Sequence, residues 1–485
     1  MSAEPIVPAA TPEPRSADPS GSAAADGLFA PERRQLVVGL VLTITLVAFE
    51  AMAIAAIMPD VKDDLGGLAL YGWVFSGFFL ASLLGIVVAG QLADTHGLVL
   101  PYVIGLGMFG AGLVIGGAAT SMPMLISGRI LQGFGAGAIP AIGYAAIGRG
   151  IPAALRPRMF AVLSTAWVVP GLVGPSAALR IEHDLSWRYV FLILLPIVVI
   201  AAVMTVPALV KLAHEPGDEE SPEDRADRLA RQRLRLRQVV LLVIGVGAAF
   251  TAASGVPLAV AVVLLAVGLP LSVNALVHLL PTGTLRLERG VPATVAVRGL
   301  LTFGFFAADA YVPLAVVDGR NGSSWIAGAA LTVSALTWSV ASWIQARLID
   351  RSGPRRLDQA GFAALVVGVG LMLAVARGIP VEFAVLAWAI AGFGIGMAYA
   401  PQAVTVLASA RPGEEGSASA AIQLSDAVGI AVGTGVGGGI IAIGAAHGWN
   451  VDTSVTGVFV LALLGAVGGL LASSRLPVRV PDQAT

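Results

Sequence analysis

Five charged residues interrupt segments that are otherwise apolar enough to cross a bilayer, and these residues could do chemistry. They are Glu50, Arg129, Arg298, Asp309 and Asp426. A charged side chain inside hydrocarbon costs on the order of 2.5–3.5 kcal/mol by insertion scales, so it should face the protein interior or a wet cavity and have a partner. Such residues either handle protons and substrates or fix the packing of helices.

Glu50 and Arg129 lie at similar depths in two predicted helices. Glu50 is about 14 residues, or roughly 21 Å, from one membrane surface, and Arg129 is about 6 residues, or roughly 9 Å, from the other. Low dielectric favours the neutral carboxyl group and a nearby guanidinium favours the charged one, so a balanced group can exchange protons near neutral pH. We predict that Glu50 handles protons beside Arg129. A static ion pair that only fixes helix packing is the alternative.

The other three charges form a second candidate set. Arg298 lies three helical turns before Asp309 on the same face, so both could line one cavity, although Arg298 could instead snorkel to the membrane surface. Asp426 lies about 10 residues, or roughly 15 Å, into its helix, where it could titrate or bind substrate. A later helix start would leave Asp426 in a milder environment. Further candidates for the cavity wall are Gln132, Trp167 and Trp388.

The helices that must position these residues follow from composition. With 56% hydrophobic and 12% charged residues in 485, the chain has more apolar surface than a soluble fold could bury. The apolar runs are continuous, and each is near the roughly 20 residues that cross a bilayer as helix, which disfavours a barrel. We expect an all-α integral membrane protein with fourteen spans, at about 36–58, 70–92, 100–119, 123–148, 158–180, 188–210, 238–254, 257–279, 291–316, 324–347, 358–377, 381–408, 416–443 and 453–473.

Several kinds of chemistry are excluded or unsupported. The chain has no cysteine, so disulfides, thiolate nucleophiles and Cys-ligated metal sites are impossible. The histidines fall in predicted loops or near helix ends and form no metal-ligand pair, and no hydrolytic triad is visible. Glycine-rich runs sit inside apolar helices, where tight packing explains them better than phosphate binding. We predict no enzyme, no cofactor and no metal, with energy supplied by an ion gradient.

The spans group into two bundles of six helices. We predict a disordered cytoplasmic tail at 1–35, bundles at 36–212 and 291–475, a charged cytoplasmic linker at 213–237, an inserted two-helix hairpin at 238–280, and a cytoplasmic tail at 476–485. The linker arginines favour a helix on an anionic membrane surface, and a solvated charged loop is the alternative. Lysine and arginine concentrate on the side of the termini, which places both termini in the cytoplasm.

The two bundles repeat one another in sequence. A shift of 259 residues aligns the Gly-Phe-Gly at 133–135 with that at 392–394, Glu50 with Asp309, and Arg129 with Trp388. Internal repeats are the sequence sign of secondary transporters, whose substrate site lies near the midplane between the halves. The mate of Arg129 is thus not a second arginine, so we expect proton coupling chiefly in the first half.

A turn between helices repeats at a shift of 256 residues. It carries Asp94 and Gly97 in the first copy and Asp350 and Gly353 in the second, with the shared spacing Asp-x-x-Gly. Arg351 follows the second aspartate, whereas Thr95 and His96 follow the first.

These motifs resemble the major facilitator superfamily over residues 36–475. Residues 90–97, from Gly90 to Gly97, are similar to its helix 2–3 motif, and 129–135 to its helix-4 motif. Residues 49–59 resemble the acidic helix-1 motif of fourteen-helix drug:proton antiporters, and 171–175 their helix-5 motif. The resemblance implies proton coupling by Glu50 and Arg129 and cytoplasmic gating by Asp94. It implies a bend used in exchange at Gly171, Gly174 and Pro175.

The sequence departs from the family pattern at two motifs, and the departure in the helix-5 motif weakens the antiporter assignment more than the fold assignment. The basic residues that normally follow the gating aspartate are missing after Asp94, which suggests asymmetric gating. In the helix-5 motif, Pro170 replaces a glycine, and Ala178-Leu179 replace a terminal glycine pair.

The sequence therefore predicts a monomeric, multi-pass, proton-coupled exporter of amphipathic small molecules in the cell membrane. Rocking of the two bundles would give alternating access, and no nucleic acid partner is expected. Export of a lipid or an endogenous metabolite, with the hairpin serving lipid access, is the main alternative. Import of a nutrient, or a membrane sensor that has lost transport, is less favoured.

Overall fold

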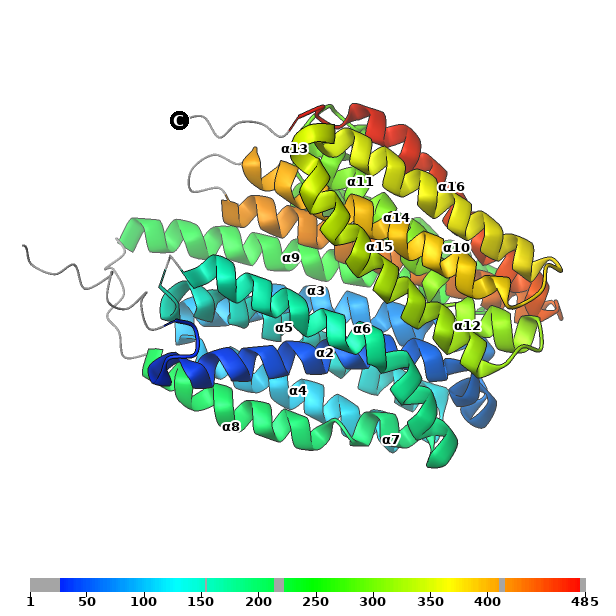
Figure 1. The fold of residues 1–485 in the computed structure, drawn as a ribbon, viewed down its shortest axis with the longest axis horizontal. Coiled ribbons are helices and arrows are strands. Elements are labelled where there is room, and N and C mark those ends of the chain that lie inside the picture. The colour runs from blue at the N-terminus through cyan, green and yellow to red at the C-terminus, as the bar shows by residue number, and fades with distance from the viewer. Residues whose placement is uncertain (1–26, 153–154, 213–221, 410–414, 480–485) are drawn as a thin grey trace, which may run out of the picture.

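The computed structural model describes residues 27–152, 155–212, 222–409 and 415–479, and in these residues the secondary structure is helical throughout. The helices lie roughly side by side and give the molecule an elongated shape (Figure 1). Residues 1–26 of the tail predicted at 1–35 lie outside the described residues. Residues 31–35, which were predicted to belong to that tail, form the first turns of a helix, because Pro31 suits the first helical position.

The first bundle follows the chain in order. Its helices are α2 (Pro31–Leu65), α3 (Tyr71–His96), α4 (Val99–Gly117), α5 (Met122–Gly150), α6 (Arg156–Asp184), α7 (Trp187–Leu192) and α8 (Leu195–Leu212). One predicted span, at 188–210, is thus built from α7 and α8 with a short break between them. The side chain of Ser186 caps α7 by accepting a hydrogen bond from the backbone N–H of Arg188.

The inserted hairpin consists of α9 (Pro222–Ala252) and α10 (Leu258–Leu279). The sequence predicted a linker that ended at residue 237, but α9 continues through that boundary as a single helix. Its first half holds no glycine and no proline after Pro222, and its Arg and Leu residues are good helix formers. Figure 1 shows α9, in green, reaching beyond its neighbours at one end of the molecule.

The second bundle begins after a one-turn helix, η3 (Thr284–Arg286). Its helices are α11 (Val291–Asp309), α12 (Val312–Leu314), the π-turn η4 (Ala315–Gly319), α13 (Ser324–Ala376), α14 (Phe383–Ala408), α15 (Glu415–Ala446), α16 (Val451–Ala472) and the short η5 (Ser473–Arg475). Gly353, with φ 71° and ψ 160°, interrupts the helical backbone of α13, which therefore joins two helices at a kink.

Twelve helices of the described part are long and apolar enough to cross a membrane. This number treats α13 as one helix, and α6, some of whose side chains lie outside the described set, is not among the twelve. The chain is a multi-pass membrane protein. The number of fourteen spans stays a prediction.

Glycines bring helices into close contact at matching places in the two bundles. A Cβ atom added to Gly133 of α5 would lie 2.1 Å from the carbonyl oxygen of Phe78 in α3. One added to Gly392 of α14 would lie 2.2 Å from the carbonyl oxygen of Ser334 in α13. Only glycine permits this backbone approach, which is the packing that the glycine-rich segments predicted.

Hydrogen bonds join the two bundles toward one end of the molecule. We call the end with the start of α9 and the α3–α4 turn the linker end, and the other the far end. Within the described residues, the hydrogen bonds between the bundles lie toward the far end: Lys62 to Asp318 at 2.5 Å, Tyr71 to the carbonyl of Ala310 at 3.5 Å, and Ser176 with Thr332 at 3.3 Å. Gly72 and Gly438 also pack backbone to backbone there.

Candidate functional site

Arg129 and Glu50 form a buried ion pair inside the first bundle. A terminal nitrogen (NH1) of Arg129, from α5, donates to Oε1 of Glu50, from α2. The arginine is 1% exposed and the glutamate 3%. The depth argument from the sequence therefore placed the two partners correctly. The role of this pair in proton transfer remains a prediction.

Arg129 is held on several sides at once. Its Nε donates to the carbonyl oxygen of Val74 at 3.1 Å, and its NH1 also donates to Oε1 of Gln132 at 2.8 Å. Its guanidinium lies 4.2 Å from the ring centroid of Phe78, a cation–π contact. The arginine is thus fixed by α2, α3 and α5, and Gln132 belongs to this site.

The carboxyl group of Glu50 is only partly satisfied. Its second oxygen, Oε2, is buried and has no hydrogen-bond partner among the described residues. An unpaired charged oxygen in a low-dielectric site is costly, and a bound proton relieves that cost. The geometry therefore suits a carboxyl group that can be protonated while Arg129 keeps the other oxygen.

The second bundle holds a pair at the equivalent place, without the arginine. The indole Nε1 of Trp388, from α14, donates to Oδ1 of Asp309, from α11, at 2.7 Å. The partners are 79 residues apart, as are Glu50 and Arg129. The repeat aligned Trp388 with Arg129 and Asp309 with Glu50, but the sequence analysis did not propose that Trp388 and Asp309 are in contact.

An aromatic cluster extends from Trp388 through the second bundle. Phe305 stacks on Trp388 with 5.7 Å between ring centroids, and it meets Trp338 edge to face at 5.8 Å. Trp338 in turn lies 5.3 Å from Tyr399. Trp388 itself is fully buried, so it is a packing residue in this conformation and not an open wall.

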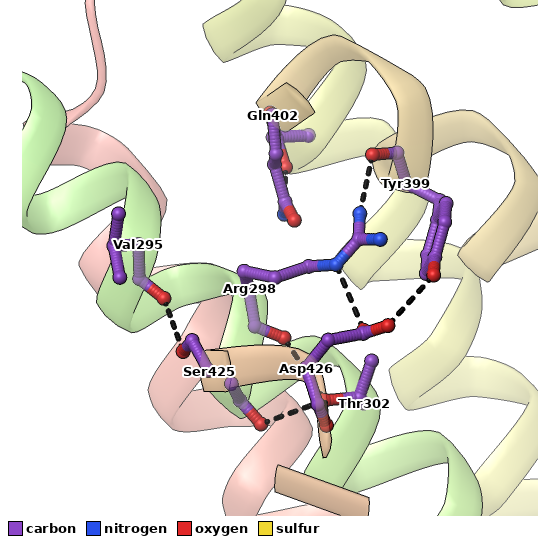
Figure 2. A network of polar contacts seen from close by, with 9 residues as sticks. Val295, Arg298, Thr302, Tyr399, Gln402, Ser425 and Asp426 are labelled. Carbon is purple, nitrogen blue, oxygen red and sulfur yellow. Dashed lines mark hydrogen bonds and ion pairs between the residues drawn. The ribbon is translucent and has the colours of Figure 1, made fainter. Parts of the chain in front are cut away.

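Arg298, which is buried, and Asp426, which is half-buried, form an ion pair inside the second bundle, shown in Figure 2. Nε of Arg298 donates to Oδ1 of Asp426 at 2.9 Å, and Tyr399 Oη donates to Oδ2 of the same carboxylate at 2.8 Å. A terminal nitrogen (NH1) of Arg298 donates to the backbone carbonyl of Tyr399 at 2.6 Å. The guanidinium also lies 3.1 Å from the centroid of the Tyr399 ring.

These contacts test the hypothesis that Arg298 snorkels to the membrane surface. Its side chain is 5% exposed and paired with Asp426, so it does not snorkel to the surface. Its hydrogen bonds go to Asp426 and to the backbone of Tyr399, and the idea that it lines one cavity with Asp309 stays a prediction. The two acids of the second bundle are bonded separately, Asp309 by an indole and Asp426 by a guanidinium and a phenol.

The sequence analysis missed one buried acid beside this network. Asp358 of α13 is fully buried, and its Oδ1 accepts a hydrogen bond from Nε2 of Gln402 at 2.6 Å. Figure 2 shows Gln402 above Arg298. The signal was present, because Asp358 opens a predicted apolar span and Gln402 follows a proline within another.

The repeated turn has the same backbone in both copies. Gly97 has φ 77° and ψ −177°, and Gly353 has φ 71° and ψ 160°, conformations that essentially only glycine adopts. Asp94 accepts a hydrogen bond from Nε2 of Gln232 in α9. Asp350 and Arg351 are exposed in the second copy. Gly90 has open space where a side chain would be.

The predicted bend lies within α6, which holds Pro170 and Pro175 inside a continuous helix. A Cβ added to Gly171 would lie 3.0 Å from Ala335 of the second bundle, and one on Gly174 3.7 Å from Met52. The glycines therefore face neighbouring helices. Trp167, one turn earlier, is 43% exposed. Within the described residues, no cluster of three or more His, Asp or Glu could hold a metal ion.

Comparison with known families identifies the class. Residues 40–434 match the sequence profile of the Major Facilitator Superfamily, and the chain therefore belongs to it. The resemblance drawn from the motifs is confirmed. The superfamily consists of membrane transporters and not of enzymes.

Particular relatives are similar over different lengths. A Mycobacterium tuberculosis protein named "Probable multidrug-efflux transporter Rv1634" is 28% identical over 89% of this chain and 92% of its own length. The Staphylococcus aureus multidrug efflux pump SdrM is 25% identical over 39% of this chain and 42% of its own.

Solved structures support the fold alone. A peptide transporter of the POT family is 16% identical, covers 93% of this chain and 98% of its own, and has a TM-score of 0.64. A D-xylose–proton symporter is 15% identical, covers 92% and 98%, and has a TM-score of 0.61.

Proposed function

We propose that this protein is a proton-coupled exporter of amphipathic small molecules. The observation that carries the proposal is the buried carboxyl group of Glu50, bonded to Arg129 through one oxygen and unpaired at the other. Membership of the superfamily and the efflux names of relatives support export.

Glu50 would bind a proton that enters along its gradient, and Arg129 would return the carboxyl group to its charged form. Substrate and proton would compete for the charged interior, so that loading one releases the other. Asp309 or Asp426 would contact a cationic substrate or carry a second proton. Because the hydrogen bonds between the bundles lie toward the far end, the structure fits the state closed at that end.

The orientation and setting belong to the same proposal. The linker end would face the cytoplasm, with both termini there, because lysine and arginine concentrate on that side. Asp94, Asp350 and Arg351 would then gate the cytoplasmic opening, and Gly171, Gly174 and Pro175 would allow α6 to bend. The protein would act as a monomer in the cell membrane, with the substrate, protons and lipid as its partners.

A proteoliposome experiment tests the role of Glu50. Wild-type protein should release protons when a cationic dye is exchanged across an imposed pH gradient. Glu50→Gln should lower the gradient-driven flux about a hundredfold or more, the usual range for removing a proton-transfer group, while dye-for-dye counterflow persists. Glu382→Gln, at an exposed loop position, is the matched control and should behave as wild type. Normal proton release by Glu50→Gln would overturn the assignment.

A further inference from the structure

The start of the inserted hairpin lies against the turn that carries Asp94. Nε2 of Gln91 donates to the backbone carbonyl oxygen of Gln232 at 2.6 Å, and Nε2 of Gln232 donates to the carboxylate of Asp94. One residue of α9 therefore both accepts from and donates to the last turns of α3. The α3–α4 turn and α9 are held together at the linker end.

The rest of α9 is packed against both bundles. Its Val239, Leu242 and Val246 form an apolar cluster with side chains of α3 and α15, among them Leu83 and Leu424. At the far end, Nε1 of Trp73 in α3 donates to Oγ of Ser254, just beyond α9, at 3.2 Å. Polar bonds thus join α9 to α3 at both ends, whereas the cluster residues of α15 are apolar. A shift of α9 along its axis would be transmitted to α3.

Exposed arginines surround Gln232 on α9. Arg231, Arg233, Arg235 and Arg237 are all exposed, and none forms an ion pair within the part of the chain that the structure describes. From Gln238 to Ala252 the helix carries no charged residue, so its apolar stretch follows Arg237. The four guanidinium groups are therefore at the edge of the hydrocarbon region, where phospholipid headgroups lie.

We propose that these four arginines, the α9 arginine site, bind the headgroups of anionic phospholipids and that bound lipid stabilises the contact of Gln232 with the α3–α4 turn. Planar guanidinium groups bind phosphate oxygens bidentately, and basic residues next to a membrane span are attracted to an anionic surface. A lipid held there fixes the height of α9 in the membrane, and with it Gln232 beside Asp94. Anionic lipid thereby favours the conformation described above, closed at the far end.

Lipid binding is tested first on purified full-length protein. Native mass spectrometry or co-purification would measure phosphatidylglycerol retained against phosphatidylcholine. We expect the variant with all four arginines changed to Gln to retain about a tenth or less of the wild-type phosphatidylglycerol, since each arginine near an anionic surface contributes about fivefold. The control, Arg286→Gln/Arg289→Gln, removes exposed charge beside the same hairpin and should lower the retention much less than the four-arginine variant does. Equal retention by both variants would overturn the proposal.

A second arm separates lipid from free phosphate. Excess inorganic phosphate or glycerol phosphate should displace no more of the retained lipid than sodium chloride does at the same ionic strength. Displacement by phosphate alone would overturn the assignment to lipid. Counterflow of dye in phosphatidylcholine vesicles checks that each variant is folded.

The link to conformation is measured without transport. The native chain has no cysteine, so spin labels at Asp63→Cys and Asn321→Cys report the distance between the bundles at the far end. Phosphatidylglycerol should shift wild-type protein toward the short distance, and this shift should be lost in the four-arginine variant and in Gln232→Ala. Gln232→Ala should still retain the lipid. If phosphatidylglycerol leaves the distance in the wild-type protein unchanged, the proposed coupling is wrong. This outcome does not depend on whether the proposed transport function is correct.

Discussion

The two halves of the molecule place an acid at the same position and give it different partners. In the first half Glu50 faces the guanidinium of Arg129, and in the second Asp309 faces the indole of Trp388. A guanidinium carries a full positive charge, so it stabilises the charged form of a carboxyl group over the neutral form. An indole N–H has no net charge and donates a single hydrogen bond. Repeated backbone geometry therefore does not imply repeated electrostatics.

The difference has consequences for what each acid can do. Protonation of Glu50 leaves Arg129 as a buried charge with a weaker partner, so the proton state of this site is coupled to the packing of α2 against α5. Protonation of Asp309 leaves no charge behind, and its carbonyl oxygen can still accept from the indole. We expect the packing of the first half to change when Glu50 is protonated. We expect the second half to change little when Asp309 is protonated.

The largest expected effect comes from breaking the ion pair. Arg129→Leu strands the buried carboxylate of Glu50 and should lower the free energy of unfolding by about 3–5 kcal/mol. Denaturant titration in detergent micelles would measure this loss. The double variant Glu50→Leu/Arg129→Leu is the control and should recover most of the stability, because replacing both charges by apolar groups is often neutral. A double variant as unstable as the single one would contradict this account.

A second prediction compares one glycine in its two copies. Gly97→Ala and Gly353→Ala both force a residue with a Cβ into a glycine-only conformation, which costs about 1–3 kcal/mol. Gly353→Ala should be the more destabilising, because its Cβ would meet the carbonyl oxygen of Val478, whereas nothing lies near Gly97. Thermal unfolding of the two variants side by side gives the order. Equal losses of stability would mean that the backbone at Val478 moves away from the added Cβ at little cost in free energy.

Much of this comparison could be predicted from the sequence. The spacing of the repeats gave the correspondence of Glu50 with Asp309 and of Arg129 with Trp388, and helix depth gave the Glu50–Arg129 pair. These predictions succeed because the helical rise and the bilayer thickness fix where a residue sits along its helix.

The rotation of each helix about its own axis was predicted less well than the depth of its residues in the membrane. Sequence spacing put Arg298 and Asp309 on one face, but it did not show that α15 supplies Asp426 to that arginine. The sequence also separated a charged linker from the hairpin after residue 237 on composition alone, and it did not show that one helix, α9, runs through both. Contacts between distant helices, such as Gln232 with Asp94, depend on packing that periodicity does not encode.

A third prediction removes the neutral hydrogen bond of the second half. Trp388→Phe keeps an aromatic ring beside Phe305 but leaves Asp309 without its donor, which should cost about 1–3 kcal/mol. Trp338→Phe, in the same aromatic cluster, controls for lost ring area and should cost less. The measurement is again denaturant titration. A larger loss at Trp338 would mean that ring packing, not the bond to Asp309, dominates at this position.

The smallest effect is expected at Asp309 itself. Asp309→Asn removes the titrating group but keeps a carbonyl oxygen that can accept from Trp388, so the stability should change by less than about 1 kcal/mol. If proton coupling lies chiefly in the first half, protons released per dye molecule should stay near the wild-type value, in contrast to Glu50→Gln. Proton release in proteoliposomes under an imposed pH gradient measures this ratio. Loss of coupling in Asp309→Asn as complete as in Glu50→Gln would show that both halves carry protons, and the neutral partner Trp388 would then not prevent titration of the acid it holds.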